Sequence, residues 1–298
     1  MPQEENSQGY CSERKGQEIG KPQAIKAANG WRQTIEIQAQ DEWTYREAFL
    51  NVLDLFSGIG GFSLGLERAG MRTVAFCEIE PYCRAVLKNH WPNVPCYDDV
   101  RTLTADRLRA DGIVPDVICG GFPCQDISEA GKLGGIEAER SGLWSEYGRV
   151  ICEFRPNYVI VENVADLLLR GIERVLGDLA SLGYDAWWSC LRACDLGAPH
   201  IRDRIWLVAY PKGCEAGREA AANCHREFAA SRAHQGAQIG RCFSDFGGKD
   251  WHPEPRICRV DDGIQSNVVQ VSAYGNAVVP QIPELIGRAI MQAEGLIP

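Results

Sequence analysis

The most constraining feature of this sequence of 298 residues is a regular alternation of short apolar runs with segments of helical spacing. Nearly continuous apolar runs occur at 50–56, 72–79, 114–121 and 157–163, and helix-like stretches separate them. Strands that are apolar on both faces and alternate with helices are typical of a parallel sheet covered on both sides. We therefore expect an α/β fold with a mostly parallel sheet.

The pattern changes after Gly183. The runs YDAWWSCLRA at 184–193 and RDRIWLVAY at 202–210 are close enough to pair as an antiparallel ribbon at the sheet edge. A last helix is expected at 281–295. Residues 1–48 are rich in Gln, Glu, Lys and Gly without a sustained period, and we interpret them as a poorly ordered extension.

Charge is unevenly distributed along the chain. The net charge of −9 argues against a protein that coats nucleic acid, because phosphate binding depends on clustered Lys and Arg. Residues 211–260, however, hold eight Lys and Arg against six acids, and their periodicity is low. We interpret 211–258 as a separate small unit or long insert. Its positive charge fits either a binding site for a polyanion or a loop face exposed to solvent.

Cysteine usage and hydropathy bear on the compartment. The 13 cysteines come without a secretory start, which argues against a disulfide framework and indicates a reducing compartment. No run approaches the roughly 20 apolar residues that cross a bilayer. We expect a cytoplasmic protein with no membrane partner.

The turn SGIGG at 57–61 follows a strand and opens a helix. Its glycines, Gly58, Gly60 and Gly61, would let the backbone approach a ligand at the carboxyl edge of the sheet, although a tight turn with no ligand is the alternative. Glu78 comes 20 residues after Gly58, at the end of the second strand, where an acid can accept hydrogen bonds from ribose hydroxyls.

Two further acids near this edge have weaker signals. Glu80 is a second candidate for the ribose-binding acid, but an acid in this position is more commonly just exposed to solvent. Asp99 follows a third short run and suits contacts to a base, although acids in a turn are commonly only turn formers.

Cys124 stands in GGFPCQDIS, at the end of a predicted strand. Phe122 and Pro123 fix a non-helical approach, so the sulfur is expected on a loop, whereas most cysteines are buried and inert. A thiolate there can act as a nucleophile if neighbouring cations or N–H groups lower its pKa.

Glu162 is the partner that fits Cys124 best. It ends the strand NYVIVE and would emerge at the same sheet edge, where a buried acid can donate a proton. His200, the candidate for a protease-like pair, has no family-like local pattern. Arg202 and Arg204 alternate on a predicted strand and would point to one face, with surface salt bridges as the alternative.

Together these segments carry a resemblance over residues 50 to 292. The sequence resembles the DNA cytosine-5 methyltransferases of bacteria and phages through DLFSGIGGFSLGLERAG, GGFPCQDIS, VENV, HIRDRIWLVA and YGNAVVPQIPELIGRAI. The resemblance implies a Rossmann-like S-adenosylmethionine-dependent methyltransferase fold with a small target recognition domain. It also implies a covalent bond between the cysteine and C6 of a flipped-out cytosine.

The resemblance also implies site residues. Cys124 would be the nucleophile, Glu162 would hold N3 of the cytosine, and Arg204 with Arg202 would contact the target base. The expected residues for S-adenosyl-L-methionine are Phe56, Ser57, Gly58, Gly60, Gly61, Glu78, Ile79, Asp99, Val100, Pro123 and Asn276.

Three further details follow from the resemblance. The segment 129–144 resembles the mobile loop that closes on DNA. His200 stands where the family more often has Gln, which puts the polar support of Arg202 in doubt, and Ala277 stands where some members have Ser.

The expected organisation has four parts: an extension at 1–48, a catalytic and cofactor-binding domain at 49–210, a target recognition region at 211–258 and a returning segment at 259–298. Arg and His side chains of the recognition region would read base edges in the major groove. No metal is expected, because the spacing of Cys214, Cys224, His225 and Cys242 matches no usual zinc pattern.

The expected partner is double-stranded DNA, bound by a monomer, with a cognate restriction endonuclease acting separately if one exists. Three other interpretations are open: an RNA cytosine methyltransferase with the same chemistry, a catalytically silent DNA-binding module, and a nicotinamide dehydrogenase suggested by the glycine turn.

Overall fold

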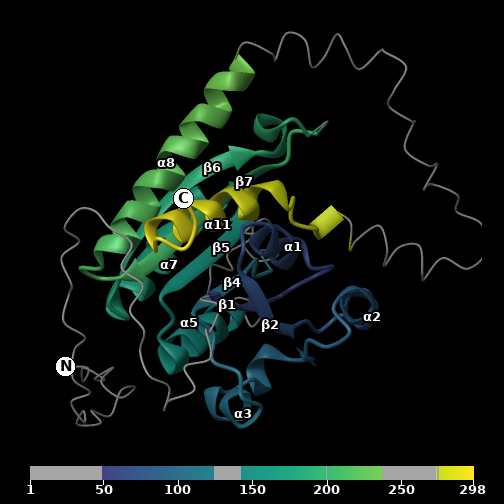
Figure 1. Cartoon of the computed structure of the whole chain (residues 1–298). Coiled ribbons are helices and arrows are strands. Elements are labelled where there is room, and N and C mark those ends of the chain that lie inside the picture. Colours follow the sequence, from purple (N-terminus) through teal and green to yellow (C-terminus); the bar gives the residue numbers. More distant parts are fainter. Residues whose placement is uncertain (1–48, 124–141, 199, 237–272, 274) are drawn as a thin grey trace, which may run out of the picture. The chain divides into compact units, whose positions relative to one another are not determined.

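The computed structural model of the chain describes residues 49–123, 142–198, 200–236, 273 and 275–298. They form a seven-stranded sheet with helices on both faces (Figure 1). The strands are β1 Asn51–Leu55, β2 Arg72–Cys77, β3 Cys96–Tyr97, β4 Val117–Gly120, β5 Tyr158–Val164, β6 Tyr184–Arg192 and β7 Asp203–Pro211. The α-helices are α1 Gly61–Arg68, α2 Pro81–His90, α3 Ala105–Ala110, α5 Gly142–Phe154, α6 Leu167–Arg170, α7 Ile172–Ser181, α8 Glu215–Gly236 and α11 Gln281–Ala293.

The sheet has the order β3-β2-β1-β4-β5-β7-β6. The strands from β3 to β5 pair in parallel, while β7 is antiparallel to both β5 and β6. The predicted α/β fold, with a mostly parallel sheet and an antiparallel ribbon at its edge, is confirmed.

Two apolar cores cover the two faces of the sheet, because successive strand residues point to opposite sides. In β1, Leu53 and Leu55 belong to the core that α3, α5 and α7 complete. Val52 belongs to the core that α1, α8 and α11 complete. Both sets are fully buried, which explains why the strands read as continuous apolar runs.

Helix α8 was not expected from the sequence, which shows low periodicity at 211–258. Its buried apolar residues do follow helical spacing: Ala220, Ala221, Cys224 and Phe228. The first three have small side chains, so the apolar periodicity in the sequence is weak. α8 packs against β6, β7 and α11. The first part of the predicted recognition region therefore joins the core of the sheet, and its remainder, 237–258, lies outside the described residues.

The C-terminal helix α11 packs against α1 on the same face of the sheet (Figure 1). Glycines permit the close approach: a Cβ on Gly65 would overlap the carbonyl oxygen of Pro280, and one on Gly287 would lie 2.7 Å from Cβ of Ala69. This contact brings residues 275–280 to the start of α1.

Other differences from the expected elements are small. The chain at 165–183, whose apolar residues have the spacing of a single helix, forms two helices, α6 and α7. They are divided at Gly171, whose N–H donates to the carbonyl of Leu167. Within the described ranges, no helix is both long and apolar enough to span a bilayer.

The strand order reverses between β1 and β4, which are neighbours in the sheet but not in the chain. In open α/β sheets, ligands bind beyond the carboxyl ends of the strands at such a switch point. The segments that follow β1, β2, β4 and β5 are therefore where a ligand site is expected.

Candidate functional site

The turn after β1 carries the three predicted glycines. Ser57 Oγ donates to the carbonyl of Asp54 at 2.6 Å, which closes the turn onto its own strand. Gly58 and Gly60 have φ values of +54° and +89°, a region that favours glycine. At Gly60 two features disfavour a side chain: the positive φ, and the ring of Trp91, which would lie 2.6 Å from a Cβ there.

Glu78 joins the ends of β1 and β2. Its Oε2 accepts from the backbone N–H of Gly58 at 2.7 Å, and its Oε1 accepts from that of Glu80 at 2.8 Å. Glu78 as a whole is 8% exposed and therefore buried. The competitor Glu80 contributes its backbone N–H to Glu78, and its side chain is exposed.

Two predicted apolar contacts flank this turn. Ile79 is 64% exposed, which is unusual for a large aliphatic side chain at the end of a buried strand. Phe56 has a left-handed φ of 52°, rare for a non-glycine residue, and its ring stacks on Tyr147 at 6.2 Å between centroids. The strained backbone at Phe56 fits a functional turn.

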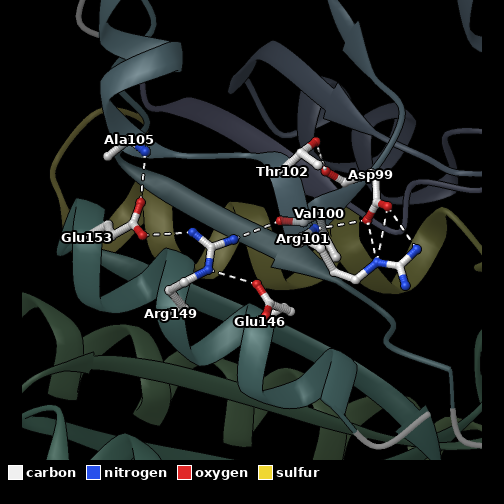
Figure 2. A network of polar contacts seen from close by, with 8 residues as sticks. All are labelled: Asp99, Val100, Arg101, Thr102, Ala105, Glu146, Arg149 and Glu153. Atoms are coloured by element: carbon white, nitrogen blue, oxygen red, sulfur yellow. Dashed lines mark hydrogen bonds and ion pairs between the residues drawn. The ribbon is translucent and has the colours of Figure 1, made fainter. Parts of the chain in front are cut away.

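Asp99 and Val100 lie beyond β3, in the polar network of Figure 2. The carboxylate of Asp99 accepts from the backbone N–H of Arg101 at 2.9 Å and pairs with its guanidinium at 2.8 Å. These hydrogen bonds to Arg101 lower the pKa of Asp99. Val100 is buried, and its carbonyl accepts from Arg149 at 2.7 Å.

The segment after β4 lies beside β5. Gly120 is paired with Val161, which sets Gly121 against Glu162: a Cβ on Gly121 would be 2.7 Å from Oε2 of that acid. Asn163 Nδ2 donates to the carbonyl of Phe122 at 3.1 Å. The amide of Asn163 therefore holds the backbone immediately before Pro123, the last described residue ahead of Cys124.

Glu162 is 8% exposed at the end of β5. Arg204 Nε lies 3.1 Å from Oε1, although that oxygen accepts no hydrogen bond from the described residues. Burial raises the pKa of Glu162, and the guanidinium groups of Arg204 and Arg202 oppose the shift. The result is a buried acid that keeps its proton to a higher pH than an ordinary glutamate.

Arg202 differs from the expectation. It precedes β7 with a φ of 34° instead of lying on the strand beside Arg204. Its guanidinium donates to the carbonyls of Gly275 and Asn276 at 2.6 and 3.1 Å. Burial and the neighbouring Arg204 lower the pKa of Arg202. Arg202 thereby links the start of β7 to the segment that leads into α11.

The structure thus brings most of the predicted residues to one edge of the sheet. Cys124 lies outside the described residues, so its placement stays a prediction. Two residues that hold the segments of the site, Asn163 and Arg149, were not predicted from the sequence. The amide of Asn163 follows Glu162 directly, but no pattern distinguishes an amide that binds a neighbouring backbone from one that binds a ligand.

The residues around the switch point fit a nucleoside-bearing cofactor such as S-adenosyl-L-methionine. A Cβ on Gly58 would meet no atom of the described residues within 4 Å, so this part of the structure leaves space beside the turn. Glu78 offers carboxylate oxygens suited to ribose hydroxyls, and Ile79 offers an exposed apolar surface suited to a base.

Comparisons with known proteins converge on one family. A family model described as C-5 cytosine-specific DNA methylase matches residues 50–255. The chain is similar to Type II methyltransferase M1.HphI of Haemophilus parahaemolyticus, with 37% identity over 175 residues, 56% of this chain and 47% of that protein. It is also similar to M2.BsuMI of Bacillus subtilis, with 35% identity over 170 residues, 54% of this chain and 42% of that protein.

The chain spans less than half the length of these two relatives. Among solved structures, it is similar to the methyltransferase EhMeth of Entamoeba histolytica, with 19% identity and a TM-score of 0.48. That match covers 55% of this chain and 53% of the other.

Proposed function

This chain belongs to the family of C-5 cytosine-specific DNA methylases, and we propose that it is a DNA cytosine-5 methyltransferase of the restriction-modification type. The similar curated proteins are named Type II methyltransferases, which supports that type. The observation that carries the proposal is Glu162: a buried acid of raised pKa at the end of β5, beside the strand end that leads to Cys124.

The proposed cosubstrate is S-adenosyl-L-methionine, which supplies an electrophilic methyl group when bound. Glu78 would accept hydrogen bonds from its ribose, and Ile79, Asp99 and Val100 would contact its adenine. The remaining residues proposed to hold it are Phe56, Ser57, Gly58, Gly60, Gly61, Pro123 and Asn276. The glycine turn supports this role, because a backbone free of side chains can approach a ligand closely.

The proposed chemistry begins with Cys124. Its thiolate attacks C6 of a flipped-out cytosine, and the new S–C6 bond sends electron density to C5. Glu162 donates its proton towards N3 of the ring, which makes the attack feasible. After C5 is methylated, water takes the C5 proton and the S–C6 bond breaks, which releases the thiolate. N3 then returns its proton to Glu162, so that both the ring and the enzyme are restored.

Arg204 and Arg202 support this step through Glu162 and the base. Arg204 would contact the target cytosine while it orients the carboxyl group of Glu162, from which it lies 3.1 Å away. Arg202 would be its partner, anchored on Gly275 and Asn276. The positive charges of Arg204 and Arg202 also disfavour the binding of a metal cation in the site.

The proposed partner is double-stranded DNA, read by residues of the 211–258 region. We propose that the enzyme works as a monomer in the cytoplasm. A cognate restriction endonuclease, where one exists, acts as a separate protein.

The test is expression of the chain in a host that lacks cytosine methylation, followed by mapping of 5-methylcytosine on plasmid DNA at base resolution. The expected result is one short motif methylated on most copies. Cys124→Ala should leave the plasmid unmethylated while cofactor binding survives, and Cys190→Ala, a matched control, should methylate normally. Folded protein that binds S-adenosyl-L-methionine and methylates tRNA but not plasmid DNA would overturn the proposal.

A further inference from the structure

The segment that carries Asp99 and Val100 has little sheet structure to hold it. The preceding strand, β3, has two residues and pairs with β2 through Cys96 and Tyr97. Two further backbone hydrogen bonds, from Phe76 to the carbonyl of Pro95 and from Glu78 to the carbonyl of Tyr97, are both 2.9 Å long. The position of the Asp99–Val100 segment relative to the rest of the site must therefore depend on other contacts.

Arg149 supplies such a contact from the middle of α5 (Figure 2). Its guanidinium donates to Glu146 and Glu153 on the same helix, both at 2.7 Å. The remaining nitrogen donates to the carbonyl of Val100, also at 2.7 Å. Two carboxylates thus fix the plane of the guanidinium, and the third contact reaches across to the segment.

The same network holds the other end of the segment. Glu153 Oε2 accepts from the backbone N–H of Ala105 at 2.8 Å, the first residue of α3. That N–H belongs to a helix start and has no partner within its own helix. Arg149 and Glu153 therefore clamp both the Val100 and the Ala105 end onto α5.

Arg149 can hold the Val100 segment mainly because of the shape of its guanidinium group and less because of its charge. A guanidinium presents several donors in a fixed plane, whereas an ammonium group is a single point charge. Its side chain is 30% exposed, so water screens the ion pairs only in part. Its contact with Val100 bonds the backbone and so fixes the chain itself.

We propose that Arg149 is a positioning residue for the cofactor: it holds the Val100 carbonyl so that Asp99 and Val100 face the adenine side of the site. The inference rests on the proposed function, because it takes Asp99 and Val100 as cofactor contacts. Arg149 touches neither cofactor nor DNA; it acts through the backbone that it anchors.

The test is the affinity of purified protein for S-adenosyl-L-methionine, measured by calorimetry. Arg149→Lys keeps a cation between the two glutamates but removes the planar fork that reaches Val100. We expect its Kd to rise about tenfold, with the melting temperature nearly unchanged and kcat at saturating cofactor within about twofold of wild type. Arg174→Lys, an arginine of α7 paired with Asp178, is the matched control and should bind normally.

A double-mutant cycle separates positioning from general stability. In an Asp99→Ala background, Arg149→Lys should cost less affinity than in wild type, because one of the two contacts that Arg149 positions is gone. Equal costs in both backgrounds, or an unchanged Kd in the single variant, would overturn the inference. Wild-type protein that binds no S-adenosyl-L-methionine would instead refute the proposed function.

Discussion

The carboxyl group of Glu162 experiences two opposing influences. Burial favours the neutral acid, whereas Arg204 and Arg202 favour the anion, and burial is the larger effect. A neutral acid can donate a proton, and a neighbouring arginine can stabilise the anion that donation leaves. This environment therefore suits a Glu162 carboxyl group that gives up a proton and takes it back during the reaction.

Replacement of Glu162 by glutamine should separate binding from chemistry. Glutamine keeps the size of the side chain but has no proton to give, so methyl transfer should fall by about 100-fold or more. The cofactor Kd should change little. Single-turnover assays on duplex DNA measure the rate, and a rate within about threefold of wild type would contradict the proposed acid role.

Asp54 is a second buried acid, one that the proposed chemistry does not use. It is 0% exposed, and its Oδ2 accepts from Ser63 Oγ at 2.7 Å. Burial raises the pKa of Asp54 from an ordinary 3.8 to about 7, although the hydrogen bonds from Ser63 act in the opposite direction. Between these two pH values, the folded protein holds a proton that the unfolded chain has released.

The stability should therefore fall as the pH rises from about 4 through 7, because the unfolded state binds fewer protons there. Asp54→Asn has no proton to lose, so its free energy of unfolding relative to wild type should improve with rising pH across that interval. Urea titrations of both proteins at several pH values measure this difference. Parallel stability curves would show that Asp54 titrates normally.

At the scale of elements, the contact between α1 and α11 depends on small residues. Gly65→Ala adds a Cβ against the carbonyl of Pro280 and should destabilise the protein by about 1–3 kcal/mol. Gly177→Ala is the matched control, since Gly177 lies within α7 and its Cβ would have no neighbour within 4 Å in the part of the chain that the structure describes. That variant should gain about 0.5–1 kcal/mol.

Urea denaturation with unchanged slope would check both changes. A Gly65→Ala variant as stable as wild type would mean that α11 can shift away from α1 at little cost. A loss at Gly177 similar to that at Gly65 would mean that backbone freedom, not the contact between helices, decides both values.

Elements with strong apolar periodicity were predictable from the sequence, and α8 was not. The helix expected at 142–154 coincides with α5, because Trp144, Tyr147 and Ile151 form a large apolar stripe. In α8 the buried stripe of described residues consists mainly of small side chains, with Phe228 as the large apolar one, and this gives little signal although the helix packs against the sheet. The paired strands β6 and β7 were predictable because their apolar runs lie close in sequence.

Within the candidate site, residues at strand ends were predictable and those that hold them were not. Glu78 and Glu162 each end an apolar run, which places them at the carboxyl edge of any parallel sheet. Asn163 and Arg149 act on backbone carbonyls of distant segments, Phe122 and Val100. Such contacts depend on tertiary structure, and no spacing along the chain reveals them.

At the scale of the whole molecule, the compact unit comprises Glu47–Pro298. The buried core starts at Leu50, and β1 lies in the middle of the sheet. Removal of residues 1–46 should leave the melting temperature and the methylation of plasmid DNA unchanged. A loss of activity greater than about tenfold, or ~1.4 kcal/mol, would mean that these residues take part in the reaction.

The packing of α8 against α11 has a consequence for evolution. Both helices lie on the same face of the sheet and complete one core, whatever the residues between them are. We therefore expect that the residues between α8 and the segment at 275–280 can change in length and composition at little cost in stability. If this stretch reads the DNA target, as proposed, a change in it would alter the sequence preference of the enzyme without a new scaffold.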